Sequence, residues 1–310
     1  MNKILLTGAS GFIGSGVLEY FLENTDYEIT CVCSWRHKGS PTRIQPNSRV
    51  DVITADLAGP LPDLGDFDYI LHLASESHVD RSIADPVNFI ENNVSSTLQM
   101  LEYARVHPPK MFVQFSTDEV YGAREHQEWD VLLPSNPYSA SKAAQEMIAI
   151  AYWSTFKVPV VITNSNNIIG KNQDKEKYIP KLINLIKNDQ EVTIHVSNGK
   201  PGARFYNPVQ NVASALLFIM DNWTDFVFEN TMHPKRFNLP GGEQLDNLQM
   251  AQKIAECLGK ELHYTLLDAE SVRPGYDSFY PKTEGILTRV GWVPPYDLES
   301  ELMEICKANA

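Results

Sequence analysis

The chain has 310 residues, 43% of them hydrophobic and 21% charged, which fits one large or two modest globular domains. Its net charge of −13 disfavours non-specific binding to nucleic acids or anionic membranes, but it allows a locally basic site for an anionic small molecule. The sequence has no signal-peptide pattern and no apolar run near the roughly 20 residues of a membrane span. We therefore expect a cytoplasmic protein that binds neither nucleic acid nor membrane.

Short apolar runs alternate with helix-like runs through the first half of the chain. The predicted strands are 3–7, 28–33, 50–54, 69–73, 112–115 and 158–164, and the main predicted helices are 12–23, 87–105 and 138–156. Such alternation is typical of an α/β fold with a doubly wound parallel sheet. We therefore expect a first domain over 1–165.

The pattern changes after residue 165, where proline, lysine and glycine become frequent. The expected helices are shorter and the expected strands isolated: helices 181–188, 211–221 and 247–258, and strands 192–195, 236–238 and 261–264. These elements predict a smaller domain, mainly over 166–310, that covers the mouth of the sheet. Segment 205–240 is expected to return to the first domain.

The four cysteines, Cys31, Cys33, Cys257 and Cys306, lack the spacing of a metal site. Cys31 and Cys33 alternate along a predicted strand, so their side chains should point the same way. We expect all four to be reduced packing residues and expect no metal site.

The first predicted strand leads into a glycine-rich turn, and a helix follows. In Gly8-Ala9-Ser10-Gly11-Phe12-Ile13-Gly14, Gly8 permits a tight turn and Gly11 lets backbone N–H groups approach a pyrophosphate. Gly14 allows close packing of the helix on the strand. Between the first strand and first helix of an α/β pattern, this turn indicates a dinucleotide cofactor; a tight turn without a ligand is the alternative.

Residues after the second and third strands bear on which cofactor binds. Asp56, which precedes Leu57, can accept a hydrogen bond from an adenine amino group or cap a helix. An acidic residue after the second strand would bind the 2′-hydroxyl of NAD, but the chain has Ser34 and Arg36 there. A hydroxyl followed by cations suits a 2′-phosphate, which favours NADP; a solvated basic loop is the alternative.

Two motifs lie at the carboxyl ends of predicted strands, where parallel sheets of this kind bind ligands. Thr117-Asp118-Glu119 follows the fifth strand, and Tyr138 lies four residues before Lys142 at the head of the next helix. Residues four apart share a helix face, so we expect the Lys142 ammonium to lower the pKa of Tyr138 from its ordinary value of about 10. Tyr138 would then be a base for a substrate hydroxyl during hydride transfer.

Together these motifs resemble the extended short-chain dehydrogenase/reductase family, and within it the sugar-nucleotide 4,6-dehydratases, especially the dTDP-glucose 4,6-dehydratases. The triplet is the specific part, because epimerases of the family usually carry small or hydroxyl residues there. The resemblance implies an NAD(P)-binding Rossmann domain over 1–165 and a sugar-nucleotide-binding domain mainly over 166–310. It covers nearly the whole chain and includes the segments 72–82, 92–94, 116–122, 138–142, 165–167, 176–180 and 273–275.

The resemblance also implies a mechanism. Tyr138 would take the proton of the C4 hydroxyl, with Thr117 bound to the same oxygen, as hydride passes to a tightly bound NAD(P). Glu119 would remove the C5 proton as general base, and Asp118 would protonate the departing C6 hydroxyl. Hydride would return to C6, so the cofactor is recycled and an NDP-4-keto-6-deoxyhexose forms. Adjacent carboxyls can hold different protonation states if their environments differ.

Further binding residues are implied by the same resemblance, although each polar one could instead be a surface residue. Arginine suits a diphosphate because it binds phosphate oxygens in pairs. Ala74 and Asn93 would line the cofactor beside Tyr138 and Lys142. A nucleotide-diphosphate hexose would be held by Ser77, Asn167, Lys177, Arg204 and Arg273.

The chain departs from the family's pattern where the base and the diphosphate would bind. The usual Asn-Asn-Tyr-Gly-Pro is altered at 167–170, the Arg-Asp-Trp segment reads Arg204-Phe205-Tyr206, and Tyr276 replaces a histidine after Arg-Pro-Gly. The donor nucleotide and the hexose therefore stay open, whereas the reaction type is better supported.

Two other functions share these residues. An NDP-sugar 4-epimerase or decarboxylase would use the same fold with Tyr138 and Lys142, but it does not need Asp118 and Glu119. A non-catalytic sensor of a dinucleotide or sugar nucleotide would not need the intact catalytic set. Helices 87–105 and 138–156 carry apolar residues on more than one face, which favours a homodimer through a four-helix bundle.

Overall fold

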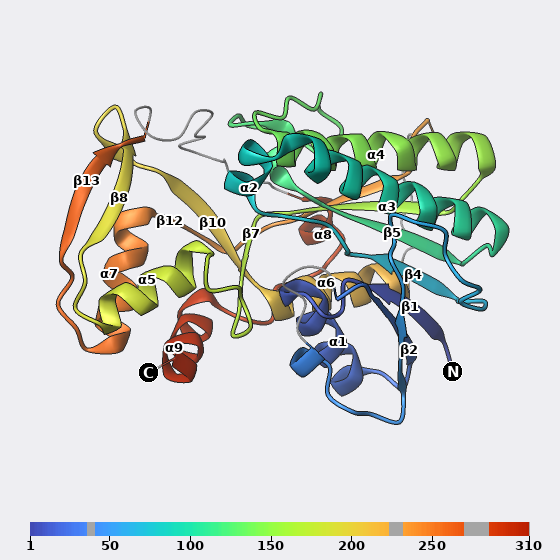
Figure 1. The fold of residues 1–310 in the computed structure, drawn as a ribbon, viewed down its shortest axis with the longest axis horizontal. Helices are drawn as coiled ribbons and strands as arrows, with labels where there is room; N and C mark the ends of the chain where they lie inside the picture. The colour runs from blue at the N-terminus through green and yellow to red at the C-terminus, as the bar shows by residue number, and fades with distance from the viewer. Residues whose placement is uncertain (36–40, 223–231, 270–284, 310) are drawn as a thin grey trace.

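The computed structural model describes residues 1–35, 41–222, 232–269 and 285–309. A seven-stranded sheet in the order β11-β6-β5-β4-β1-β2-β3 forms its centre (Figure 1), and every pairing in it is parallel. The predicted doubly wound parallel sheet is confirmed. Its strands are β1 (Lys3–Thr7), β2 (Glu28–Cys33), β3 (Val50–Thr54), β4 (Tyr69–His72), β5 (Met111–Thr117), β6 (Val160–Ser165) and β11 (Lys235–Leu239).

Helices cover both faces of this sheet. On one face lie α1 (Phe12–Asn24) and α6 (Val209–Asn222), and on the other α3 (Pro86–Val106) and α4 (Pro137–Phe156), preceded by the short α2 (Val79–Ala84) (Figure 1). Successive residues of a strand point to opposite faces. In β1, Ile4 and Leu6 therefore pack with α1 and α6, whereas Leu5 packs with α3 and α4.

A second hydrophobic core forms at the other end of the molecule, around Leu182, Ile194, Ile254 and Leu302. It is built from two three-stranded sheets and three helices (Figure 1). The sheets are β7 (Asn167–Ile169), β10 (Ala203–Pro208) and β12 (Glu243–Asp246), and β8 (Val192–Ser197), β9 (Lys200–Pro201) and β13 (Tyr264–Asp268); the helices are α5 (Tyr178–Lys187), α7 (Asn247–Leu258) and α9 (Leu298–Asn309).

The elements of the second half were harder to predict than those of the first. The strand expected over 261–264 is wrong: β13 covers Tyr264–Asp268. Strands β7, β10 and β12 and helix α9 were not predicted. Segment 205–240 returns in part: β11 joins the large sheet and α6 packs against it, whereas residues 205–208 belong to β10 of another sheet. The division into domains at residue 165 stays a proposal.

All four cysteines are free, and Cys31 and Cys33 both lie in the core under α1 and α6, as predicted. Cys257 is exposed, so it is not a packing residue.

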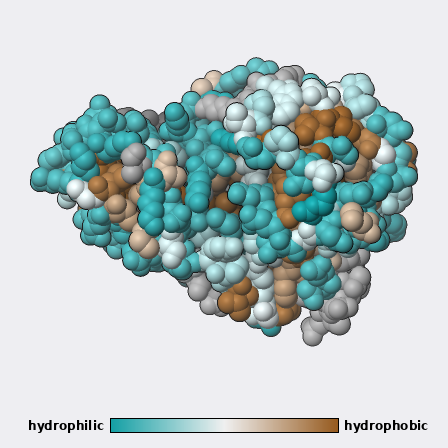
Figure 2. All heavy atoms as spheres, turned by 90° about the horizontal axis from the view of Figure 1, so that it is seen from below, coloured by the Kyte–Doolittle hydropathy of each residue, from teal (hydrophilic) through white to brown (hydrophobic). Residues whose placement is uncertain are grey.

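Within the described ranges no group of three or more metal-binding side chains gathers. Nor does any described helix have the length and apolarity to span a membrane. Seen from below, the surface is mainly hydrophilic with separate hydrophobic patches (Figure 2); a cytoplasmic location stays a prediction.

Candidate active site

The turn between β1 and α1 has the geometry of a dinucleotide-binding loop. Gly8 has a φ of +80°, and a Cβ there would lie 2.9 Å from the backbone nitrogen of Ala74, so only glycine fits. The Gly11 N–H donates to the Gly8 carbonyl at 2.9 Å. Gly11 is the N-cap of α1, it offers no side-chain cap, and the first turn carries no acidic residue. The helix N-terminus thus suits an anionic group.

Phe12, Ile13 and Gly14 form the first turn of that helix. Ala74, opposite Gly8, donates its N–H to Thr7 Oγ1 at 3.1 Å. Asn93 is buried on α3, where it accepts from the Glu76 N–H at 2.7 Å and donates to Ser141 Oγ of α4 at 2.9 Å. Asn93 therefore ties the loop after β4 to the helix of Tyr138.

Two residues predicted to bind the cofactor, Ser34 and Asp56, lie just after β2 and β3. Ser34 follows β2, and the exposed Asp56 follows β3, where its Oδ1 accepts from the Ala58 N–H at 3.1 Å. Leu57 is buried in the core beneath α3 and α4. Arg36 and Arg273 both lie outside the described residues.

Asp118 lies at the carboxyl end of β5 and is only 2% exposed. Its Oδ2 accepts from Asn166 Nδ2 at 2.6 Å, and its Oδ1 accepts from Thr117 Oγ1 at 3.2 Å. Burial, with a contribution from the charge of Glu119, raises the pKa of Asp118 to about 7, although Asn166, Arg204 and Thr117 oppose the rise. A large fraction of Asp118 is therefore protonated at neutral pH, as a general acid requires.

Glu119, the next residue, is the charged neighbour of this acid. Its N–H donates to Thr117 Oγ1 at 3.3 Å. Its carboxylate raises the pKa of Asp118 and of Tyr138, and it favours the charged form of Lys177. The two adjacent carboxyls therefore have different surroundings. Asp118 is buried away from water, whereas Glu119 interacts with the acidic Asp118 and with the basic Lys177.

Tyr138 enters the same cluster from the start of α4. A capping box on Asn136 begins the helix, and the Tyr138 N–H donates to Ser82 Oγ at 3.1 Å. The phenol is buried and hydrogen-bonded to the Thr117 side chain. Thr117, Asp118, Glu119 and Tyr138, predicted from two separate motifs, therefore converge at one end of β5.

The prediction that the pKa of Tyr138 is lowered is wrong. Burial, joined by the Glu119 charge, raises the pKa of Tyr138 above its ordinary value. Lys142 Nζ donates to the Phe115 carbonyl at 2.7 Å, and burial lowers the pKa of Lys142 to about 7. The helical spacing of Tyr138 and Lys142 is as predicted, but burial opposes the charged forms of both side chains.

The predicted substrate residues come from the second half of the chain and from the loop after β4. Lys177 Nζ donates to the Ser77 carbonyl at 2.7 Å, and burial lowers the pKa of Lys177. Arg204 on β10 favours the ionised form of Asp118. Asn167 on β7 pairs with Tyr206 of β10. Arg204 and Lys177 are thus close enough to Asp118 and Glu119, respectively, to interact with their charges.

Two residues of the cluster were not predicted as site residues: Asn166, which donates a hydrogen bond to Asp118, and Ser82, whose hydroxyl accepts from the Tyr138 N–H. A signal for Asn166 existed, because it directly follows β6, next to β5 in the sheet. Polar residues at that edge of a parallel sheet commonly contact ligands.

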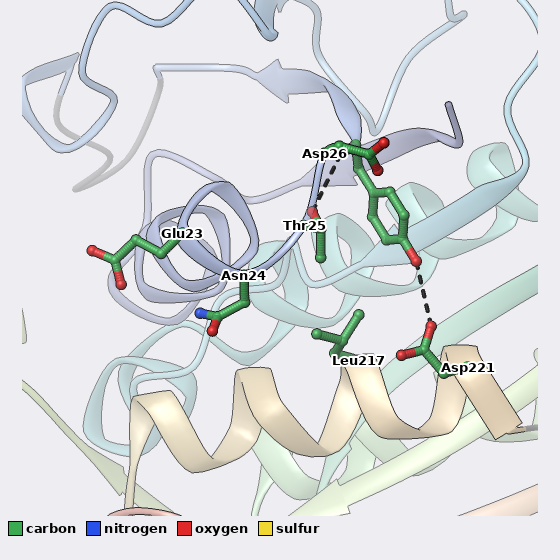
Figure 3. A pocket seen from close by; sticks show the side chains of 7 residues that line it. Glu23, Asn24, Thr25, Asp26, Leu217 and Asp221 are labelled. Atoms are coloured by element: carbon green, nitrogen blue, oxygen red, sulfur yellow. Dashed lines mark hydrogen bonds between the residues drawn. The ribbon is translucent and has the colours of Figure 1, made fainter.

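A separate pocket of about 500 Å³ lies between the end of α1 and α6 (Figure 3). Tyr27 directly precedes β2, so this pocket is at the amino ends of the strands, opposite the catalytic cluster. The Tyr27 hydroxyl donates to Asp221 Oδ1 at 3.4 Å. The lining residues are Glu23, Asn24, Thr25, Asp26, Tyr27, Leu217 and Asp221.

Two known proteins are similar in sequence to most of this chain. A dTDP-glucose 4,6-dehydratase of Streptomyces antibioticus is 31% identical, over 90% of this chain and 83% of its own. A trifunctional UDP-glucose 4,6-dehydratase/3,5-epimerase/reductase of Arabidopsis thaliana is 32% identical over 94% of this chain, which spans only 45% of that longer protein.

Solved structures match nearly the whole chain. The dTDP-glucose 4,6-dehydratase DesIV of Streptomyces venezuelae, with NAD and TYD bound, superposes with a TM-score of 0.87 at 26% identity, over 99% of this chain and 96% of its own. A UDP-N-acetylglucosamine 4-epimerase of Methanobrevibacter ruminantium shares the fold, with a TM-score of 0.86 at 23% identity over 99% and 97%. Residues 4–232 match the model of the NAD dependent epimerase/dehydratase family. The chain therefore belongs to that family, the extended short-chain dehydrogenases/reductases.

Proposed function

We propose that the protein is an NDP-hexose 4,6-dehydratase, which forms an NDP-4-keto-6-deoxyhexose by oxidation at C4, loss of water across C5 and C6, and return of hydride to C6. The observation that carries the proposal is the pair Asp118 and Glu119. The pKa of Asp118, raised to about 7 by burial, makes it a proton donor beside a carboxylate. Elimination of water needs one acid and one base on neighbouring atoms of the substrate.

The glycine turn fits an NAD(P) cofactor, since it offers a helix N-terminus with no side-chain cap or acidic residue. The cofactor would be held by Gly8, Gly11, Phe12, Ile13 and Gly14, with Ser34, Arg36, Asp56, Leu57, Ala74 and Asn93 around it. When bound, NAD(P) supplies the hydride acceptor and later donor, and its oxidised form adds positive charge that favours ionised Tyr138. We propose that it stays bound and is recycled.

Ser34 and Arg36 lead us to expect tighter binding of NADP than of NAD. Titration of the apo-protein with each cofactor tests this preference. Equal affinities, or tighter binding of NAD, would contradict it.

The residues at the end of β5 divide the reaction among them. Tyr138 accepts the proton of the C4 hydroxyl while Thr117, bonded to its phenol, holds the same oxygen. Glu119 takes the C5 proton, which the new C4 ketone has made acidic, and it gives a proton back to C5 as hydride returns to C6. Asp118 gives its proton to the C6 oxygen, which leaves as water. Lys142, on the helix face of Tyr138, adds positive charge when protonated.

The substrate diphosphate would be bound by Asn167, Lys177, Arg204 and Arg273, and Ser77 would contact the substrate beside them. A 4-epimerase with the same Tyr138 and Lys142 is the second candidate, favoured by the fold it shares with the sugar-nucleotide 4-epimerase named above. An epimerase does not require the acid Asp118, so we rank it lower.

Mass spectrometry after incubation with UDP-, dTDP-, GDP- and CDP-hexoses tests the proposal. A product lighter by one water supports a dehydratase and identifies the nucleotide. An unchanged mass with inverted C4 would indicate an epimerase, and loss of carbon dioxide from a hexuronate would indicate a decarboxylase. Tight cofactor binding without any turnover would favour a sensor.

A further inference from the structure

Asn166 connects the proposed acid Asp118 to the backbone of a distant loop. The Asn166 side chain is 4% exposed. Its Nδ2 donates to Asp118 Oδ2 at 2.6 Å, while its Oδ1 accepts from the Gly241 N–H at 2.8 Å. An amide whose oxygen receives a backbone N–H must present its NH₂ group on the other side. The orientation of Asn166 is therefore fixed, and Asp118 Oδ2 faces a donor.

This contact decides which oxygen of neutral Asp118 carries the proton. When Asp118 is ionised, Oδ1 accepts from the Thr117 hydroxyl, but a hydroxyl can rotate and accept instead, whereas the Asn166 NH₂ group can only donate. The proton of neutral Asp118 therefore belongs on Oδ1. Oδ1 lies 3.2 Å from Thr117 Oγ1, the hydroxyl that is also bonded to Tyr138. The acid proton thus faces the side on which Thr117 and Tyr138 converge.

We propose that Asn166 is a positioning residue that holds the Asp118 carboxyl with its acidic Oδ1 toward the substrate and thereby serves the elimination step alone. This inference rests on the proposed dehydratase function and deepens it. Asn166 has no place in the hydride transfer, for which Tyr138 and Thr117 provide the polar groups.

The second anchor of Asn166 depends on a glycine. A Cβ on Gly241 would lie 2.6 Å from the Tyr206 carbonyl oxygen and 2.9 Å from its carbon, so the backbone of Gly241 packs directly on β10. The same strand carries Arg204, whose charge favours ionised Asp118. A larger residue at 241 would move the N–H that orients Asn166, so Gly241→Ala is expected to act in the same direction as loss of the amide.

The experiment compares Asn166→Ala with Asn207→Ala in the full chain. Asn207 is a matched control, because it is a buried asparagine whose Nδ2 donates to the Leu239 carbonyl at 3.4 Å and has no contact with Asp118 among the described hydrogen bonds. In single turnovers, Asn166→Ala should slow water loss roughly ten- to hundredfold, part of the 10²–10⁴-fold that a positioned acid contributes. Reduced nicotinamide should still form at the wild-type rate.

The pH profile separates positioning from a structural defect. Asn166 favours ionised Asp118, so its removal should raise the pKa of Asp118 and move the alkaline limit of water loss to higher pH. Carbon-13 NMR of labelled aspartate carboxyls should show the same rise in the folded protein without substrate. Asn207→Ala should leave both unchanged, and Gly241→Ala should shift both part of the way.

Each result bears on one of the two proposals. If wild type loses water and Asn166→Ala only lowers the rate, with an unmoved pH limit and an unchanged Asp118 titration, the positioning role is wrong and the dehydratase stands. Slowed hydride transfer in Asn166→Ala would also overturn it. If wild type does not remove water from any of the UDP-, dTDP-, GDP- and CDP-hexoses, the dehydratase proposal is wrong, and the positioning role of Asn166 is wrong as well.

Discussion

Glu146 Oε2 and Arg236 Nη2 lie 2.5 Å apart, and neither side chain is more than 1% exposed. Glu146 is one turn beyond Lys142 on α4, and Arg236 lies on β11. Asn164 of β6 donates both to Glu146 Oε1 at 2.7 Å and to the Thr117 carbonyl at 3.1 Å. The ion pair thus joins α4, β6 and β11 directly beneath the proposed catalytic residues.

Breaking this pair should destabilise the fold strongly. In Glu146→Gln the buried Arg236 keeps only neutral hydrogen-bond partners among the described residues, the Glu128 carbonyl at 2.9 Å and the Tyr121 hydroxyl at 3.3 Å. An uncompensated buried charge costs about 3–5 kcal/mol, so urea unfolding should show a loss of that size with an unchanged m-value. Arg105→Gln, which breaks the exposed pair with Glu102, should cost about 1 kcal/mol or less. Similar losses in the two variants would contradict the prediction.

The sequence could predict those parts of the site that depend on local patterns. The turn at Gly8 and Gly11 follows from a strand–glycine–helix pattern, and the shared face of Tyr138 and Lys142 follows from helical spacing. Thr117-Asp118-Glu119 was found because it ends a recognisable strand. Each of these signals is contained within a few residues.

Other parts depend on contacts that no local pattern contains. The bond between Asp118 and Asn166 joins two strand ends 48 residues apart in sequence, and the pKa of Tyr138 depends on burial by distant segments. Strand β10 was missed because Arg-Phe-Tyr-Asn-Pro does not alternate apolar and polar residues. Such features require the register of the sheet, which the sequence alone did not provide.

Removing the charge of Asp118 should stabilise the protein at alkaline pH. The pKa of Asp118 is about 7 in the folded chain against an ordinary 3.8, so between these values the folded state binds more protons than the unfolded one. Stability therefore falls as pH rises through this window, and the loss is complete above pH 7. Asp118→Asn stays neutral and should raise the Tm of the apo-protein well above pH 7 but not below pH 4.

Asp51→Asn is a suitable control, because Asp51 is exposed on β3. Its substitution should leave the difference in Tm between acid and alkaline buffer unchanged. If Asp118→Asn behaves in the same way, Asp118 has no raised pKa in the folded protein.

The homodimer stays a proposal, and α3 and α4 carry its support. These helices pack together and leave large apolar side chains exposed, among them Leu98, Met147 and Phe156, the last two 48% and 49% exposed. Pairing with a second copy would bury them in a four-helix bundle. Sedimentation at micromolar concentration should give a dimer for wild type and a monomer for Leu98→Glu/Met147→Glu.

Val293→Glu provides the control for added charge, since Val293 is exposed outside both helices. It should remain dimeric. A monomeric wild type, or a double variant that still dimerises, would contradict the bundle.

The last prediction separates Glu119 from Tyr138. If Glu119 takes the C5 proton only after C4 is oxidised, Glu119→Gln should still reduce the cofactor but should lose elimination by roughly 10²–10⁴-fold. Tyr138→Phe should fail at the first step and give no reduced nicotinamide. Asp118→Asn should resemble Glu119→Gln, because the C6 oxygen needs a proton only when it leaves.

A single turnover with a C5-deuterated sugar nucleotide distinguishes these steps when nicotinamide absorbance and exchange at C5 are followed together. Wild type should lose the deuterium to solvent, because Glu119 removes it and exchanges it before returning a proton. Glu119→Gln should retain the deuterium while the absorbance of reduced nicotinamide builds up. If Glu119→Gln instead exchanges C5 normally, or dehydrates near the wild-type rate, Glu119 is a structural carboxylate and the dehydratase proposal loses its main support.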